Sequence, residues 1–242
     1  MSILIVNGRK ATLDQCEFEK FHGNSIFTTL RSRDKRPCYF ELHWERLEDH
    51  AKFFSYHLPD KYEIFSLFEE VLKDRSADQK IRIIIYQKSF AITMEDLIPL
   101  SPQIYDGATV IISKQVIHPL LGKFKTGNSL PYFLAAAEAK EASVFEGLLS
   151  DIYGHVVDGS RTGLMLLQED NLIGLSGGLD SIMRKLAMDV ANSMGIKTTF
   201  KKLTPAQLSG QLFLTNSLLG VIPVGNLNAP LAKEFFTRCA SL

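Results

Sequence analysis

Hydrophobic and polar positions follow two periods in the first half of the chain. SILIVNGRKATL predicts two short strands around Asn7-Gly8, a dipeptide typical of tight hairpin turns. NSIFTTLRSRDKRPCYF repeats this pattern, with a polar turn near Asp34-Lys35. The period then becomes helical in two stripes, one through Trp44, Leu47, Ala51 and Phe54 and one from Ile64 to Leu72. This half of the chain therefore predicts a sheet covered by two amphipathic helices.

The same patterns predict two α+β lobes. KIRIIIYQ and ATVIIS are expected strands, so residues 1–112 form an N-terminal lobe, and 113–122 has the weak periodicity of a connector. Residues 123–242 form a C-terminal lobe: LPYFLAAAEAKEAS favours a helix, short strands with glycine turns follow, and SIMRKLAMDVANSMGIK is a helix ending near Gly195. A junction between two lobes commonly hosts a ligand site.

Composition narrows the class of function. The 242 residues suffice for roughly one to two domains. Lys+Arg and Asp+Glu balance at 27 each, so no global positive field attracts nucleic acid or an anionic membrane. No apolar run reaches a membrane span, and the N-terminus lacks the features of a signal peptide. We therefore expect a cytoplasmic protein that acts on a small, partly anionic molecule, without nucleic acid or membrane partners.

The cysteines and histidines do not indicate a metal site. Cys16, Cys38 and Cys239 are odd in number and lack metal-type spacing, so free thiols are expected. The six histidines form no metal spacing with carboxylates or thiols. His43 and His50 lie seven residues apart on a predicted helix, and we interpret both as structural or solvated.

The helix start at Ser181 is a candidate anion site. Its first turn holds Arg184 rather than the acid that the helix dipole favours, and a bound anion would relieve this. Asp180 or Ser181 can be the N-cap, and the backbone N–H groups of Ile182 and Met183 would then face the anion. The plainer alternative is an ordinary capped helix with a solvated arginine.

Other polar residues also have plain alternatives. Arg46 lies at the border of an apolar helix stripe, where an arginine usually covers the surface with its stem. Asp158 ends a strand before a glycine, a position typical of turn residues. Thr215, Asn216 and Ser217 interrupt an apolar strand and need partners from the backbone or a ligand.

GKFKTGNSLPYFLAAAEAKE holds three lysines, and composition alone does not separate a nucleophile from solvated surface. Lys123 and Lys125 precede the predicted helix, whereas Lys140 lies within it. Lys123 either lowers the basicity of Lys125 through its charge or faces water.

Six segments in order resemble the motifs of one family, the fold type IV pyridoxal-phosphate enzymes. This family includes branched-chain and D-amino-acid aminotransferases and 4-amino-4-deoxychorismate lyase. The resemblance covers nearly the whole chain, through GNSIFTT, FELHWERLEDHA, KTGNSLPYFLAAAEAKE, GHVVDGSRTGLMLL, GGLDSIMRKLA and FLTNSLLGVIPV. One such match is weak, but six at suitable separations make coincidence unconvincing.

The resemblance implies a fold and a set of roles. It implies a two-lobed, D-amino-acid aminotransferase-like α+β fold with pyridoxal 5′-phosphate between the lobes. Lys125 matches the lysine that links to the cofactor, Arg46 the phosphate arginine, and Asp158 the carboxylate paired with the pyridine nitrogen. Phosphate contacts are implied for the backbone of Ile182 and Met183 and for the hydroxyl of Ser217.

Two features favour the lyase within this family. Thr28 stands where the aminotransferases usually have glutamate, and TNSLLGVIPV is similar to the lyase form of the last strand. The resemblance then implies conversion of aminodeoxychorismate to 4-aminobenzoate and pyruvate for folate biosynthesis. Lys125 and Thr28 are its implied catalytic residues, and Arg161 is a guess for holding substrate carboxylates. A homodimer is also implied.

Two alternatives stay open, and the second of them rests on several departures from the motifs. Asp158 is shorter than the usual glutamate, Ser181 replaces a glycine, Gly163 replaces the usual asparagine, and Asn24-Ser25 replaces Asp-Gly. One alternative is a class IV aminotransferase of branched-chain or D-amino acids. The other is a binding or scaffold protein whose active site has been lost.

Overall fold

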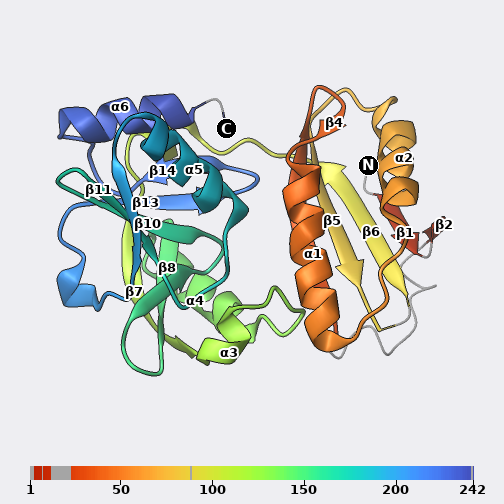
Figure 1. Ribbon diagram of the computed structural model, residues 1–242, viewed down its shortest axis with the longest axis horizontal. Coiled ribbons are helices and arrows are strands. Elements are labelled where there is room, and N and C mark those ends of the chain that lie inside the picture. Colours follow the sequence, from red (N-terminus) through yellow and green to blue (C-terminus); the bar gives the residue numbers. More distant parts are fainter. Residues whose placement is uncertain (1–2, 7, 12–22, 88, 241) are drawn as a thin grey trace. The chain divides into compact units, whose positions relative to one another are not determined.

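The computed structural model describes residues 3–6, 8–11, 23–87, 89–240 and 242. They divide into two compact units, shown in Figure 1. Unit 1 is formed within Met1–Pro99 and Phe124–Ser129, and unit 2 within Leu100–Lys123 and Leu130–Leu242. Each unit combines helices and sheets, which confirms the predicted α+β class.

Unit 1 is a six-stranded antiparallel sheet with two helices packed on one face (Figure 1). The strand order is β2-β1-β6-β5-β3-β4. Its elements are β1 (Ile3–Val6), β2 (Arg9–Ala11), β3 (Ile26–Arg33), β4 (Arg36–Pro37), α1 (Phe40–Phe54), α2 (Lys61–Leu72), β5 (Gln79–Ile85) and β6 (Phe90–Asp96).

The core of unit 1 follows from the two periods of its sequence. Every second residue of β5 is buried, and the isoleucines on that face pack with Trp44 and Phe68 of the helices. The turn at Asp34-Lys35 is confirmed, with positive φ at both residues. The hairpin of β1 and β2 is confirmed by their antiparallel register, although Asn7 lies outside the described residues.

Unit 2 contains a five-stranded sheet of order β12-β11-β10-β13-β14 and a three-stranded sheet of order β7-β8-β9. Helix α4 packs on β7 and β8, whereas α5 and α6 pack on the larger sheet. Its elements are 3₁₀ helix η3 (Pro102–Tyr105), β7 (Val110–Ile117), α3 (Pro119–Gly122), α4 (Leu130–Glu141), β8 (Glu146–Asp151), β9 (Val156–Gly159), β10 (Gly163–Gln168), β11 (Asn171–Leu175), α5 (Ile182–Ser193), β12 (Lys197–Lys201), 3₁₀ helix η4 (Pro205–Gln207), β13 (Gln211–Asn216), β14 (Gly220–Pro223) and α6 (Pro230–Cys239).

The units divide the chain at other residues than the predicted lobes. Strand β7 continues to Ile117 and pairs in parallel with β8, so residues 110–112 belong to unit 2 and much of the expected connector is strand. Residues 124–129 pack in unit 1. The sequence patterns also did not predict β6, β12 or α6.

Across the residues that the structure describes, no helix is long and apolar enough to cross a membrane. The thiols of Cys38 and Cys239 are free, and burial raises the pKa of Cys239 to about 12. Cys16 lies outside the described residues. Among the residues that the structure describes, no cluster of three or more histidine, cysteine or acidic side chains could hold a metal ion.

Candidate active site

Thr28, His43 and Arg46 form a hydrogen-bonded cluster in unit 1. Nη2 of Arg46 donates to Oγ1 of Thr28 at 2.5 Å and lies 3.4 Å from Nδ1 of His43. Thr28 Oγ1 lies 2.7 Å from the same Nδ1. A guanidinium can only donate, so the Thr28 hydroxyl accepts a hydrogen bond from Arg46 and donates one to Nδ1 of His43. The cluster connects β3 with the inner face of α1.

His43 is the neutral imidazole of this cluster. If Nδ1 accepts, the ring proton is on Nε2, a buried atom with no hydrogen-bond partner among the described residues. Burial lowers the pKa of His43 well below its ordinary value, and the charges of Arg46 and Lys125 lower it further. Of the two interpretations of His43, structural and solvated, its full burial excludes the second, and its ring contacts two predicted site residues.

Lys125 belongs to unit 1, although the sequence placed it in the C-terminal lobe. Its carbonyl accepts the Phe27 N–H at 2.8 Å, and Thr126 forms an antiparallel bridge with Ile26. Its own N–H donates to Nδ1 of His50 at 3.4 Å. The amine Nζ lies 4.8 Å from the centre of the Phe27 ring, within the range of a cation–π contact. Backbone pairing with β3 thus places Lys125 beside the strand that carries Thr28.

An aromatic cluster anchors the segment that carries Lys125. The Phe124 ring lies 5.2 Å from His50, 4.3 Å from Phe53 and 5.0 Å from Phe54, centre to centre. Lys125 itself is half-buried. Because Lys123 and Lys140 are exposed, only Lys125 of the three lysines has the partly buried setting that suits a reactive amine.

Asp158 lies at the end of β9 in unit 2 and is buried. Its Oδ2 accepts the Leu179 N–H at 3.2 Å, and its carboxylate also bonds with the Tyr132 hydroxyl. Burial, and then the charge of Asp158, raise the pKa of Tyr132 well above its ordinary value. The chain packs closely here, because a Cβ on Gly178 would lie 2.6 Å from the Val157 carbonyl oxygen and 3.0 Å from Asp158 Oδ2.

Ser181 is the N-cap of α5, and its Oγ accepts the N–H of Arg184 at 3.3 Å. The first N–H groups of a helix have no partner within it. Those of Ile182 and Met183 are therefore used neither by hydrogen bonds of the helix nor by the Ser181 cap. The arrangement is suited to an anion.

Arg184 corrects both sequence interpretations of its charge. The residue is only 2% exposed, and its side chain turns back to donate to the Leu175 carbonyl at 2.7 Å and the Leu179 carbonyl at 3.1 Å. It is therefore neither solvated nor in need of an anion, and it fixes the loop that precedes α5.

The polar residues at the end of β13 have separate partners. Thr215 is buried, and its Oγ1 lies 3.2 Å from Ser181 Oγ. Asn216 donates to the Arg161 carbonyl at 2.6 Å and accepts the Leu218 N–H at 2.8 Å. Ser217 is half-buried in the turn between β13 and β14. Hydrogen bonds within unit 2 thus account for Thr215 and Asn216, two of the three polar residues that interrupt the apolar strand.

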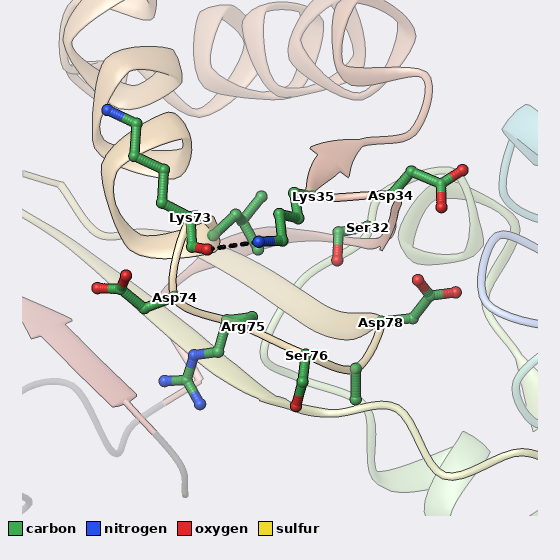
Figure 2. Close-up of a pocket in the computed structure, with 10 residues that line it drawn as sticks. Ser32, Asp34, Lys35, Lys73, Asp74, Arg75, Ser76 and Asp78 are labelled. Atoms are coloured by element: carbon green, nitrogen blue, oxygen red, sulfur yellow. Dashed lines mark hydrogen bonds between the residues drawn. The ribbon is translucent and has the colours of Figure 1, made fainter.

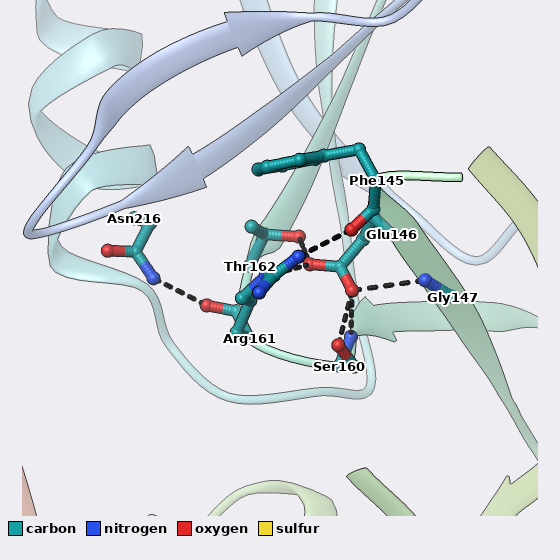
Figure 3. A network of polar contacts seen from close by, with 7 residues as sticks. All are labelled: Phe145, Glu146, Gly147, Ser160, Arg161, Thr162 and Asn216. Atoms are coloured by element: carbon teal, nitrogen blue, oxygen red, sulfur yellow. Dashed lines mark hydrogen bonds and ion pairs between the residues drawn. The ribbon is translucent and has the colours of Figure 1, made fainter. Parts of the chain in front are cut away.

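A buried carboxylate holds the loop after Asp158, as Figure 3 shows. Glu146 is fully buried, and its Oε1 accepts the N–H groups of Gly147 and Ser160 at 3.0 Å and also the Ser160 hydroxyl. Oε2 accepts the Thr162 hydroxyl at 3.0 Å. Local sequence patterns did not indicate Glu146, because Ser160 and Thr162, which donate to it, lie 14 and 16 residues further along the chain.

Arg161 is tied to the same network (Figure 3). Its Nη2 donates to the Phe145 carbonyl at 2.5 Å, its guanidinium lies over the Phe145 ring, and Nε is 3.8 Å from Glu146. These contacts make it a poorer candidate for holding substrate carboxylates than the sequence suggested.

A pocket in unit 1 contains none of the predicted site residues. Its volume is about 330 Å³, and it lies at the C-terminal end of α2 and the β3–β4 turn (Figure 2). Acidic and basic side chains both line it, and Lys35 donates across it to the Lys73 carbonyl at 2.8 Å. Because the lining side chains carry charges of both signs, the pocket does not indicate a class of ligand.

The chain matches the family model for amino-transferase class IV over residues 25–227. The chain therefore belongs to the class IV aminotransferase family, which confirms the predicted resemblance.

Relatives within this family differ in activity. A "Probable branched-chain-amino-acid aminotransferase" of Thermotoga maritima is 29% identical, over 90% of this chain and 82% of that protein. An aminodeoxychorismate lyase of Vibrio harveyi is 23% identical, over 89% of this chain and 87% of that protein.

Solved structures have the same fold. A "Putative 4-amino-4-deoxychorismate lyase" is 34% identical with a TM-score of 0.88 and covers 96% of each chain. A hypothetical aminotransferase from Mycobacterium tuberculosis, in a PLP-bound form, has a TM-score of 0.83 at 16% identity and covers 99% of each chain. The fold and the family are thus clear, whereas relatives of two activities match.

Proposed function

We propose that this chain is a pyridoxal-phosphate-dependent lyase that converts 4-amino-4-deoxychorismate to 4-aminobenzoate and pyruvate. The product is the aromatic part of folate, so the step belongs to folate biosynthesis. The observation that carries the proposal is Thr28, a buried hydroxyl held by Arg46 and His43 where the family's aminotransferases usually have an acid.

The residues present fit the cofactor. Family membership and the PLP-bound neighbour support pyridoxal phosphate, and its phosphate requires N–H donors and a cation. In this proposal the N–H groups of Ile182 and Met183 would contact the phosphate, with a guanidinium from Arg46 and a hydroxyl from Ser217. Asp158 supplies a buried carboxylate for the pyridine nitrogen, with Leu179 and Tyr132 fixing its direction.

In this proposal Lys125 would hold the cofactor covalently and, once the substrate amine has displaced it, would act as the base. The bound cofactor supplies an electron sink for the pair left behind by a departing proton. The neutral amine of Lys125 removes the proton from the ring carbon that bears the substrate nitrogen. The ring-carbon to oxygen bond then breaks, enolpyruvate leaves, and the ring becomes aromatic. A proton returned to the enol carbon gives pyruvate, so protons and electrons balance.

Thr28 would orient the substrate or this proton transfer. Its hydroxyl is fully buried and already engaged by a cation on one side and a neutral imidazole on the other. Such a hydroxyl has a fixed direction, which is what a positioning role in catalysis requires.

The experiment is a fluorescence assay of 4-aminobenzoate released from aminodeoxychorismate by the purified protein with added cofactor. We expect release with equimolar pyruvate and no requirement for a second oxo acid. Glutamate formation from an amino acid and 2-oxoglutarate, without 4-aminobenzoate, would overturn the lyase proposal.

The aminotransferase is the second candidate. The 29% identity to the Thermotoga maritima protein favours it, since that relative is named for branched-chain amino acids. It requires a reversible proton shift and two half-reactions, and the same pair of assays separates it from the lyase.

We further propose a homodimer. Helix α4, within unit 2, buries Ala135 and Ala139 and leaves Leu130, Phe133 and Leu134 exposed. Because these three lie at i, i+3 and i+4, they form one apolar surface of the kind that marks an interface. Light scattering should give twice the 27.2 kDa of one chain, and Phe133→Glu should lower that mass.

A further inference from the structure

Gly163 and Ser181 compete for the same space in unit 2. Gly163 begins β10 and lies opposite Thr215 of β13. A Cβ added to Gly163 would lie 2.7 Å from Ser181 Cβ, 3.1 Å from Ser181 Oγ and 2.9 Å from Thr215 Oγ1. The two approaches below 3.0 Å, to Ser181 Cβ and Thr215 Oγ1, are excluded by van der Waals repulsion unless one of the atoms moves. There is therefore room for a side chain at position 163 or at position 181, but not for both.

Ser181 is the neighbour that decides this competition. Thr215 Oγ1 is the end of a side chain and can move by rotation about one bond. Ser181 Cβ is fixed to the backbone of the N-cap residue, and its Oγ accepts the Arg184 N–H. Displacing Ser181 therefore means displacing the first turn of α5.

The Ser181 hydroxyl joins three elements. It caps α5 through Arg184, exchanges a hydrogen bond with Thr215 of β13 at 3.2 Å, and lies above the first residue of β10. The cap satisfies the Arg184 N–H. The N–H groups of Ile182 and Met183 are not used by the cap or by hydrogen bonds within the helix.

We propose that Ser181 replaces in space the side chain that Gly163 lacks, and that this pair positions the first turn of α5 for an anion. Two separate departures from the family motifs are then one structural change. The steric part stands on its own, whereas the identity of the anion as the cofactor phosphate rests on the proposed function. Ser181 is a positioning residue in this account.

The steric part is tested by placing Gly163→Ala in three backgrounds without cofactor. With Ser181 or Ser181→Ala the Cβ at 181 remains, and we expect the melting temperature to fall by about 3–10 °C. With Ser181→Gly the space is free, and we expect Gly163→Ala to lower it by less than about 2 °C. Glycine is tolerated at an N-cap, so this background should fold. An equal loss in all three backgrounds would overturn the exchange.

The positioning part is tested by the dissociation constant for pyridoxal 5′-phosphate, measured by equilibrium dialysis. We expect Gly163→Ala to raise it by about tenfold or more, because the first turn of α5 is displaced. Ser193→Ala, at the far end of the same helix, should leave it within about twofold of wild type. Wild-type affinity in Gly163→Ala would overturn the positioning role. If the wild-type protein does not bind pyridoxal 5′-phosphate, the proposed function and the identity of the anion are both overturned. The melting temperatures then still test the steric exchange between Gly163 and Ser181.

Discussion

The hydroxyl of Thr28 lies between the guanidinium of Arg46, at 2.5 Å, and Nδ1 of His43, at 2.7 Å. One buried oxygen thus joins a strand to a helix and accepts from a cation while donating to a neutral ring. The sequence indicated Thr28 and Arg46 separately, whereas the structure joins their side chains by a hydrogen bond.

Thr28→Val should test this shared oxygen. Valine keeps the shape but leaves His43 and Arg46 without it, so we expect a loss of about 1–3 kcal/mol in the free energy of unfolding, measured by urea denaturation. Thr28→Ser should retain most of the stability and the lyase activity. Equal stability of Thr28→Val and wild type would show that the contacts carry no energy.

Lys125→Ala should abolish the covalent link to the cofactor, because no other amine of its segment has the same half-buried position beside Phe27. Borohydride treatment followed by peptide mass spectrometry identifies the linked lysine. The exposed Lys123 is the matched control, and Lys123→Ala should remain linked at Lys125. A cofactor found on Lys123 would contradict the assignment.

Asp158→Asn should lower kcat on the order of 10²-fold, the scale observed when one electrostatic contact to a reacting group is removed. Cofactor affinity should change less, since the proposed phosphate contacts are made by other residues. Tyr132→Phe removes one partner of Asp158 and should give a smaller effect on kcat. Activity of Asp158→Asn at the wild-type level would exclude a role for this carboxylate.

Glu146→Gln should destabilise unit 2 by about 2–4 kcal/mol, because an amide cannot accept from all the donors that the carboxylate satisfies. The control is Glu138→Gln, since Glu138 also accepts several hydrogen bonds but is half-buried. Urea unfolding should rank Glu146→Gln well below Glu138→Gln. The reverse order would mean that the network of Figure 3 contributes little.

His43 should make stability depend on pH in a defined window. Its pKa is lowered in the folded state, so both states are neutral above about pH 6.5, the unfolded value. Below that pH the His43 side chain binds a proton in the unfolded chain but stays neutral in the folded chain. The free energy of unfolding therefore falls by up to about 1.4 kcal/mol per pH unit. His43→Asn should flatten this slope in urea unfolding between pH 7 and pH 5. Identical slopes would place the titration elsewhere.

Sequence periodicity predicted most of the elements and the motifs predicted the family, because both depend on residues close together in the chain. Non-local pairing was not accessible in this way. Nothing in KTGN indicates that Lys125 pairs with β3, because the partner at Phe27 is 98 positions earlier. Arg184 was misread for a similar reason, since its carbonyl partners depend on the fold of the preceding loop. His43 could have been noticed from its i, i+3 spacing with Arg46, which places both on one side of a helix.

The short segment Phe124–Ser129 has a consequence for how the protein is made. Unit 1 lacks one of its pieces until residue 129 has been synthesised, although the rest of it ends at Pro99. A nascent chain must therefore begin unit 2 before it can complete unit 1. For the same reason neither unit can be excised as one continuous fragment, and a fragment ending at residue 112 would keep β3 but leave out the proposed cofactor lysine that pairs with it.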